Sequence, residues 1–225
     1  MHRAYTDNAG SECQRHAIAY QGIAEETHAA AVKSRGRIAR KPLQIASVSA
    51  MAPHKGVETV VQALAKLRRT RNLSPSLLLI GIWPVPAYEQ RIRRLVIATG
   101  LQNVVTFLGH VSQEDLYRYY AESSVFCLMS QCESFGIPAV EAQAFGTPVV
   151  SSNCCAIPEV CGSGGIFPAP GDVAGTAGAL AELLTRRDTW NRLSTAAVQN
   201  AAKYHWDICS QPLISTLQTL RRESI

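Results

Sequence analysis

The residues in this sequence best suited to chemistry are two glutamates, Glu133 and Glu141, which flank a Phe-Gly turn in the segment Glu-Ser-Phe-Gly-Ile-Pro-Ala-Val-Glu. Gly136 gives the backbone the freedom to approach a ligand closely, and Pro138 suits the first turn of a helix. A helix that starts there directs its free amides and positive dipole end at whatever lies in front. Glu133 then stays on the loop while Glu141 falls inside the helix. We therefore expect a site that binds hydroxyls and anions together, with the two carboxylates approaching from different directions.

More than one chemistry is open to these residues. Glu133 and Glu141 could act as general acid and base, as in glycoside hydrolysis. They could instead bind hydroxyls, because ionised carboxylates accept several hydrogen bonds, or be ordinary surface glutamates. Lys55, in the segment Pro-His-Lys-Gly, could reach a diphosphate as a mobile cation or could be a solvated loop lysine. For His54 and His110, near the same expected edge, a structural role is the simpler interpretation.

Several familiar motifs are absent from the sequence. It contains no G-x-x-x-x-G-K-S/T loop, no G-x-G-x-x-G after the first expected strand and no G-x-S-x-G elbow. Cys154, Cys155 and Cys161 lack paired C-x-x-C spacing and a nearby histidine, so we expect no metal site and no cofactor. Phosphate binding must therefore use another arrangement.

Composition and net charge exclude few classes of ligand or partner. The 225 residues are 47% hydrophobic and 17% charged, as in an ordinary globular protein with ample length for a core. The net charge of +5 suits anionic ligands or a loose membrane-surface contact, and it does not indicate nucleic acid. The basic groups are interpreted as solvated faces; they are Arg35–Lys41, Arg68–Arg71, Arg91–Arg94 and Arg221–Arg222.

Targeting signals are missing from the sequence. Met1–Cys13 has no apolar stretch typical of a signal peptide. The longest apolar run, Leu77–Val85, is interrupted by Gly81 and Pro84 and is too short to span a bilayer. Seven scattered cysteines, an odd number, indicate reduced thiols. The sequence thus predicts a cytoplasmic location, with a peripheral membrane contact left open.

Short apolar runs alternate with amphipathic segments from about Leu43 onward, which predicts an α/β fold: a Rossmann-like parallel sheet with helices on both faces. Ligands bind beyond the carboxyl ends of such strands, and Gly81, Val111 and Glu133 each follow or end one. The expected strands are Leu43–Val48, Ser76–Ile80, Val104–Leu108, Val125–Met129 and Thr147–Ser151. The expected helices are Val57–Arg69, Ala87–Thr99, one opened by Ser112, one formed from the Glu133–Phe145 segment, a short piece at Ile157–Val160, Val173–Leu184 and Thr189–Tyr204.

The two ends of the chain are less regular. Ala17–Gln21 could be a strand, Ala24–Lys33 a helix and Ser34–Lys41 a basic linker. Asp207–Arg222 is a further helix candidate, with a set of apolar residues on one side: Ile208, Leu213, Ile214, Leu217 and Leu220.

Together these residues resemble the C-terminal half of retaining glycosyltransferases of the GT-B fold, specifically the large family 4. The resemblance runs from about Ile18 to the end of the chain. Its most specific part is the signature of two glutamates with seven residues between them, Glu133 and Glu141, the second of which opens the run Glu-Ala-x-Ala-x-Gly-Thr-Pro-Val-Val. Further similar segments are Pro53–Gly56, Leu77–Gly81, Val105–Val111, Asp115–Ala121, Ile157–Val160 and His205–Trp206.

The resemblance implies a single GT-B half-domain that binds a nucleotide-diphospho-sugar donor. Lys55 would neutralise the diphosphate and Glu133 would lie by the donor sugar, and these two are the implied catalytic residues. Glu141 would take the ribose hydroxyls. Retaining transfer of this kind would need no metal, because positive charge and amides stabilise the leaving diphosphate. The other implied donor-binding positions are Gly81, Val111, Phe135, Gly136 and Ile137.

Two departures from the family pattern have consequences. The family usually has an arginine five residues before the lysine, and here that position is Ala50. Losing one charge-assisted phosphate contact would cost about 1.5–3 kcal/mol. The second departure is that almost none of the N-terminal, acceptor-binding half is present.

The missing half shapes the expected domain organisation. Residues 1–41 would be a remnant of the preceding domain with the interdomain linker, 42–206 the nucleotide-sugar-binding domain, and 207–225 a helix that would cross onto the missing domain. An uncovered apolar side on that helix predicts a partner. We expect a transferase part that is inactive without an N-terminal half, which a separate chain or a homo-oligomer could supply. The alternative is a module that binds a nucleotide sugar without catalysis, and a hydrolase using both glutamates is a weaker third.

Overall fold

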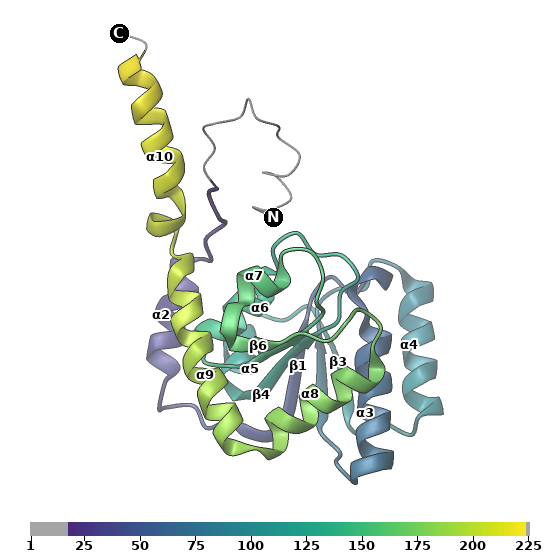
Figure 1. Cartoon of the computed structure of the whole chain (residues 1–225). Coiled ribbons are helices and arrows are strands. Elements are labelled where there is room, and N and C mark those ends of the chain that lie inside the picture. Colours follow the sequence, from purple (N-terminus) through teal and green to yellow (C-terminus); the bar gives the residue numbers. More distant parts are fainter. Residues whose placement is uncertain (1–17, 224–225) are drawn as a thin grey trace.

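A six-stranded parallel sheet forms the centre of the computed structural model, which describes residues 18–223 (Figure 1). The strands lie in the order β3-β2-β1-β4-β5-β6, and each neighbouring pair is parallel. The order reverses between β1 and β4, which creates the switch point where open α/β sheets bind ligands. The strands are β1 (Lys41–Val48), β2 (Ser76–Ile80), β3 (Val105–Gly109), β4 (Ser123–Leu128), β5 (Val149–Ser151) and β6 (Gly165–Ile166).

Helices cover both faces of this sheet, as the sequence predicts. Helices α3, α4 and α8 contribute to the core on one face, and α2, α5 and α6 to the core on the other. The helices are α2 (Glu25–Ser34), α3 (Val57–Arg71), α4 (Pro86–Ala98), α5 (Gln113–Glu122), α6 (Ile137–Ala144), α7 (Ile157–Cys161), α8 (Val173–Thr185), α9 (Arg187–Ala201) and α10 (Trp206–Glu223).

The strands divide their side chains between these two cores. In β4, Val125 and Cys127 lie in one core, whereas Phe126 and Leu128 lie in the other, which is the period-two alternation of a strand. Because both faces are covered, the central strand β2 is almost entirely apolar and buried after Ser76. The predicted Rossmann-like sheet is confirmed.

The helix start predicted at Ser112 is also confirmed, as the start of α5. The Ser112 hydroxyl accepts a hydrogen bond from the amide of Asp115 at 3.1 Å, which satisfies one of the free amides in the first turn. The cap fixes where α5 starts. It thereby places Tyr120, near the end of the helix, in the core beneath α6.

The strand predicted for Ala17–Gln21 is wrong where it can be checked. Ala17 lies outside the described residues, as does the rest of the first part of the expected remnant at residues 1–41, and residues 18–24 have no regular secondary structure. The amide of Ile23 instead donates to the carbonyl of Tyr204 at 2.9 Å. This segment is therefore tied to the chain just before α10 and joins no strand of the sheet.

Arg40 is a second correction, because the basic segment Arg35–Lys41 is not wholly a solvated face. The Arg40 guanidinium is partly buried and donates to the carbonyls of Ala121 and Ser123 at 3.0 and 2.7 Å. It also donates to the Thr147 hydroxyl at 2.7 Å. Sequence reasoning missed this role because the acceptors are mostly main-chain carbonyls, which carry no signature in the residue types.

Helix α10 extends away from the body of the sheet (Figure 1). Its predicted apolar side is open to solvent among the described residues, with Ile208, Leu213 and Leu217 each more than half exposed. Across residues 18–223, no helix has both the length and the apolar character that crossing a bilayer requires.

Candidate functional site

Lys55 and Glu133 come together at the switch point of the sheet. Lys55 ends a short 3-10 helix, Pro53–Lys55, that follows β1, and Glu133 lies in the loop between β4 and α6. Since β1 and β4 are neighbours, the carboxyl ends of both strands deliver these residues to the same edge. Their association joins positions 78 residues apart in the sequence.

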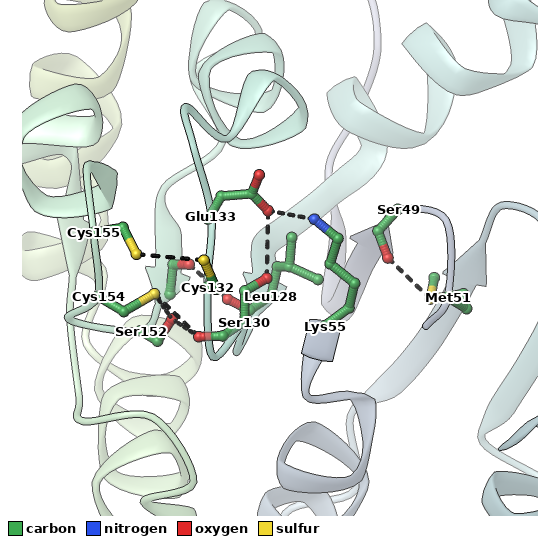
Figure 2. A network of polar contacts seen from close by, with 11 residues as sticks. Ser49, Met51, Lys55, Leu128, Ser130, Cys132, Glu133, Ser152, Cys154 and Cys155 are labelled. Atoms are coloured by element: carbon green, nitrogen blue, oxygen red, sulfur yellow. Dashed lines mark hydrogen bonds and ion pairs between the residues drawn. The ribbon is translucent and has the colours of Figure 1, made fainter. Parts of the chain in front are cut away.

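The two side chains form an ion pair. Lys55 Nζ donates to Glu133 Oε2 at 2.6 Å, and both side chains are mostly shielded, with 17% and 12% of their surfaces exposed. The Ser130 hydroxyl lies 3.5 Å from the same oxygen. Figure 2 shows the second carboxylate oxygen of Glu133 pointing away from the pair. Shielding from water strengthens such a pair, so an anionic ligand that takes Lys55 must compete with Glu133 for it.

Backbone contacts hold the two loops in place. The Gln131 amide donates to the carbonyl of His54 at 2.7 Å, which ties the loop after β4 to the loop after β1. Gly56 has φ +64°, and a Cβ there would lie 1.9 Å from the Met129 carbonyl oxygen. A larger residue would force the loops apart. His54 thus contributes through its main chain, in keeping with a structural role.

The start of α6 offers unoccupied donors beside this pair. Gly136 has φ +87° and caps the helix without a side-chain hydrogen bond. Among the described residues, the amides of Phe135, Gly136 and Ile137 have no hydrogen-bond acceptor. Free amides and the positive end of the helix dipole make such a terminus suited to anions. The Phe135 ring itself is buried and packs edge-on against Tyr204, with centroids 5.4 Å apart, so it anchors the turn.

Glu141 points toward α5. Its Oε2 accepts a hydrogen bond from the hydroxyl of Tyr120 at 3.0 Å. Burial raises the pKa of Glu141, and the hydrogen bond from Tyr120 partly opposes that shift. Glu141 Oε1 has no hydrogen-bond partner among residues 18–223 and is not one of the fully buried unpaired atoms there. One oxygen is therefore fixed by the fold, and the other can accept from a ligand.

Gly81 and Val111 lie at the ends of β2 and β3, on one side of the ion pair. The Gly81 amide donates to the Gly109 carbonyl at 2.8 Å. A Cβ at Gly81, where φ is +133°, would lie 1.9 Å from the Ser49 carbonyl oxygen. The glycine is therefore required by the close approach of the chain after β1. Val111 packs against the core shared with α5 and α6.

Three cysteines lie near Glu133, and the sequence analysis assigned them no role. Cys132 precedes Glu133, and Cys154 and Cys155 lie in the loop after β5 (Figure 2). Within residues 18–223, no group of three or more His, Cys, Asp or Glu side chains is arranged to hold a metal ion. Only the pairing of β4 with β5, which a single sequence does not specify, brings Cys154 and Cys155 to Cys132 and Glu133.

Residues 30–201 match the family model described as glycosyl transferases group 1. Among curated proteins, the chain is 29% identical to O-antigen chain mannosyltransferase B of Escherichia coli, over 77% of this chain and 45% of that protein. It is 30% identical to the GDP-mannose-dependent alpha-(1-6)-phosphatidylinositol monomannoside mannosyltransferase of Mycobacterium tuberculosis, over 84% and 50% respectively. The chain thus spans about half the length of these relatives.

Solved structures agree with this partial coverage. Sucrose-phosphate synthase from Thermosynechococcus elongatus superposes with a TM-score of 0.80 at 25% identity, covering 99% of this chain and 57% of that one. Anabaena HepE, solved in complex with UDP, gives a TM-score of 0.80 at 21% identity, covering 96% and 61%. Almost the whole chain therefore superposes on one part of each of these longer chains. Its fold is that of one GT-B half-domain.

Proposed function

The chain belongs to the glycosyl transferases group 1 family, and from that membership we propose that it is the donor-binding part of a retaining glycosyltransferase. It binds a nucleotide-diphospho-sugar, and it transfers the sugar only when an acceptor-binding half is supplied. The observation that carries this proposal is the Lys55–Glu133 ion pair beside the free amides at the start of α6. A cation, free amides and a carboxylate there match the diphosphate and the sugar of such a donor.

In the proposed reaction, the groups at the ion pair act on the diphosphate and on the sugar. Lys55 and the amides at Phe135, Gly136 and Ile137 stabilise the negative charge that grows on the diphosphate as its bond to the sugar breaks. Glu133, released from Lys55 by the incoming phosphates, turns to the sugar and its developing positive charge. No metal is needed in this scheme, because protein groups supply the positive charge.

The nucleoside is held at the other end of the site. Glu141 accepts hydrogen bonds from the ribose hydroxyls through Oε1, while Tyr120 holds Oε2. The base lies against the main chain at Val111 and the strand end at Gly81. Gly81, Val111 and Glu141 stay assigned by resemblance. The positions of Gly81 and Val111 just after β2 and β3 support the assignment of these two residues.

Calorimetric titration with UDP-, GDP- and ADP-sugars tests the proposal directly. GDP-mannose and UDP-glucose belong in the panel because the Mycobacterium tuberculosis relative is GDP-mannose-dependent and HepE has been solved in complex with UDP-glucose. We expect one base to be preferred. No binding of any donor at millimolar concentration would contradict the proposed function.

Glu141→Gln is expected to weaken binding of the preferred nucleoside diphosphate about tenfold, because a charged acceptor for the ribose becomes neutral. The loss should be equal with and without the sugar. Glu182→Gln, at an exposed position on α8, is the matched control and should bind as the unmodified chain does. Unchanged affinity in Glu141→Gln would exclude the ribose role.

Glu133→Gln separates the sugar from the diphosphate. The change releases Lys55 from its ion pair, so UDP or GDP alone should bind at least as tightly as before. Binding of the complete nucleotide sugar should weaken relative to the nucleoside diphosphate, because the carboxylate no longer meets the sugar. Equal losses for both ligands in the titration would contradict this role.

A second candidate, binding without catalysis, is favoured by Ala50, where the family usually has a second cation. Transfer assays with a supplied N-terminal half distinguish the two. The open side of α10 is the surface that such a half, or a second copy, would cover. Binding without transfer in the reconstituted pair would support the binding module over the transferase.

A further inference from the structure

Two thiols meet at the rim of the proposed donor site. Cys132 follows β4 and Cys155 follows β5, and these strands are neighbours in the sheet. Their Sγ atoms lie 3.8 Å apart, and both side chains are exposed (Figure 2). A pair that is both close and accessible can be oxidised without unfolding the core.

The environment of Cys155 favours its thiolate. The main-chain amide of Glu133, and after it the thiol of Cys132, hydrogen-bond to the Cys155 sulfur and lower its pKa. A low-pKa, accessible cysteine beside a second thiol is the usual arrangement of a peroxide-sensitive site.

The adjacent Cys154 is different. Its Sγ donates to the Ser130 carbonyl at 3.2 Å and lies 3.1 Å from the Ser152 hydroxyl. Burial raises the pKa of the Cys154 thiol. Cys155 has φ +49°, in the left-handed region, and the two neighbouring side chains reach different partners (Figure 2). Cys154 is thus held in the structure and serves as a natural control.

We propose that Cys132 and Cys155 form a redox-active pair that a hydroperoxide converts into a disulfide beside Glu133. The Cys155 thiolate attacks the peroxide oxygen, the O–O bond breaks, and an alcohol or water leaves as Cys155 becomes a sulfenic acid. The Cys132 thiol then attacks that sulfur and releases water as the S–S bond forms. In sum, two thiols lose two electrons and two protons, and one peroxide becomes one alcohol, or water, plus one water.

The disulfide would disturb the ion pair. The sulfurs must approach from 3.8 Å to about 2.0 Å, and Cys132 is joined directly to Glu133. Closure therefore draws the loop toward β5 and shifts Glu133 from its 2.6 Å contact with Lys55. The inferred consequence, weaker donor binding in the oxidised form, rests on the proposed function.

Peptide mapping decides whether the bond forms. The reduced chain is treated with stoichiometric hydrogen peroxide, alkylated, and cut with a glutamate-specific protease, since no Lys or Arg lies between Arg118 and Arg186 for trypsin. We expect peptides 123–133 and 142–159 to be linked. Cys155→Ser should abolish the link, whereas Cys154→Ser should retain it. A bond from Cys154, or sulfinic acid without any link, would overturn the proposed pair.

Titration of the same samples decides the consequence. The oxidised chain should bind its nucleotide sugar about tenfold more weakly than the reduced chain, and a thiol reductant should restore the affinity. Peroxide-treated Cys155→Ser should bind like the untreated variant. A linked chain with unchanged affinity would overturn the effect on binding. If the reduced chain binds no donor at all, the proposed function fails, and the peptide map alone still decides the thiol pair.

Discussion

Replacing Lys55 with alanine is expected to weaken binding of the preferred nucleoside diphosphate by about 10- to 100-fold, the value of one charge-assisted phosphate contact. Two features of the site place the effect at the upper end. Ala50 stands where the family usually supplies a second cation, so nothing in that position compensates. Removing Lys55 also leaves the Glu133 carboxylate, now 2.6 Å from Nζ, unpaired beside the phosphates and repelling them.

The chain offers a matched control for this variant. Lys41 Nζ donates to Glu122 at 2.7 Å, so it is also a lysine in an ion pair with glutamate. It lies at the opposite end of the same strand, β1, which Lys55 follows. Lys41→Ala should therefore leave the affinity unchanged in calorimetry.

A double variant separates the two contributions. Adding Glu133→Gln to Lys55→Ala removes the repulsion and should recover part of the lost affinity for UDP or GDP. If Lys55→Ala alone binds as tightly as the unmodified chain, the diphosphate does not contact Lys55.

Arg40→Ala is expected to lower the free energy of unfolding by about 3–5 kcal/mol, as when one partner is removed from a buried charged network. The guanidinium links chain segments that meet at the amino-terminal edge of the sheet. It bonds the carbonyls of Tyr120, Ala121 and Ser123, at the end of α5, and that of Phe145, after α6. Helix ends leave such carbonyls without internal partners.

The negative ends of the two helix dipoles offset the cost of burying this charge. Burial lowers the pKa of Arg40 to about 10, which still leaves it charged at neutral pH. A cavity of about 710 Å³ opens beside it. Water entering there can satisfy some of the freed carbonyls, which keeps the expected loss from being larger.

Urea unfolding measures this effect, and Trp190, whose ring centre lies 5.1 Å from the guanidinium, is a fluorescent reporter. Arg37→Ala, an exposed neighbour in the same basic segment, should change stability by less than about 0.5 kcal/mol. Arg40→Lys should recover only part of the stability, because an ammonium cannot span the same acceptors. A loss below about 1 kcal/mol in Arg40→Ala would show that these hydrogen bonds do not hold the edge together.

The class of fold could be predicted because it follows from hydrophobic patterns within short segments of the sequence. The alternation of apolar strands with amphipathic helices gives a parallel sheet covered on both faces, because each period follows from the geometry of one element. The same reasoning placed Gly81, Val111 and Glu133 at the carboxyl edge. It failed at Ala17–Gln21, because the described part of that segment, residues 18–21, has no regular secondary structure. Just beyond it, the amide of Ile23 donates to the carbonyl of Tyr204 and not to a strand.

The sequence by itself determined the strand and helix periods, the edge of the sheet that carries the candidate site, and the glutamate signature around Gly136. Only the tertiary structure decided which side chains meet: Lys55 with Glu133, Cys132 with Cys155, and Arg40 with carbonyls of the α5 end. The physical reason is that these contacts depend on the order of strands in the sheet. The strand order is set by how helices pack on both faces of the sheet at once. Hydrophobic periodicity, in contrast, describes only one helix or strand at a time.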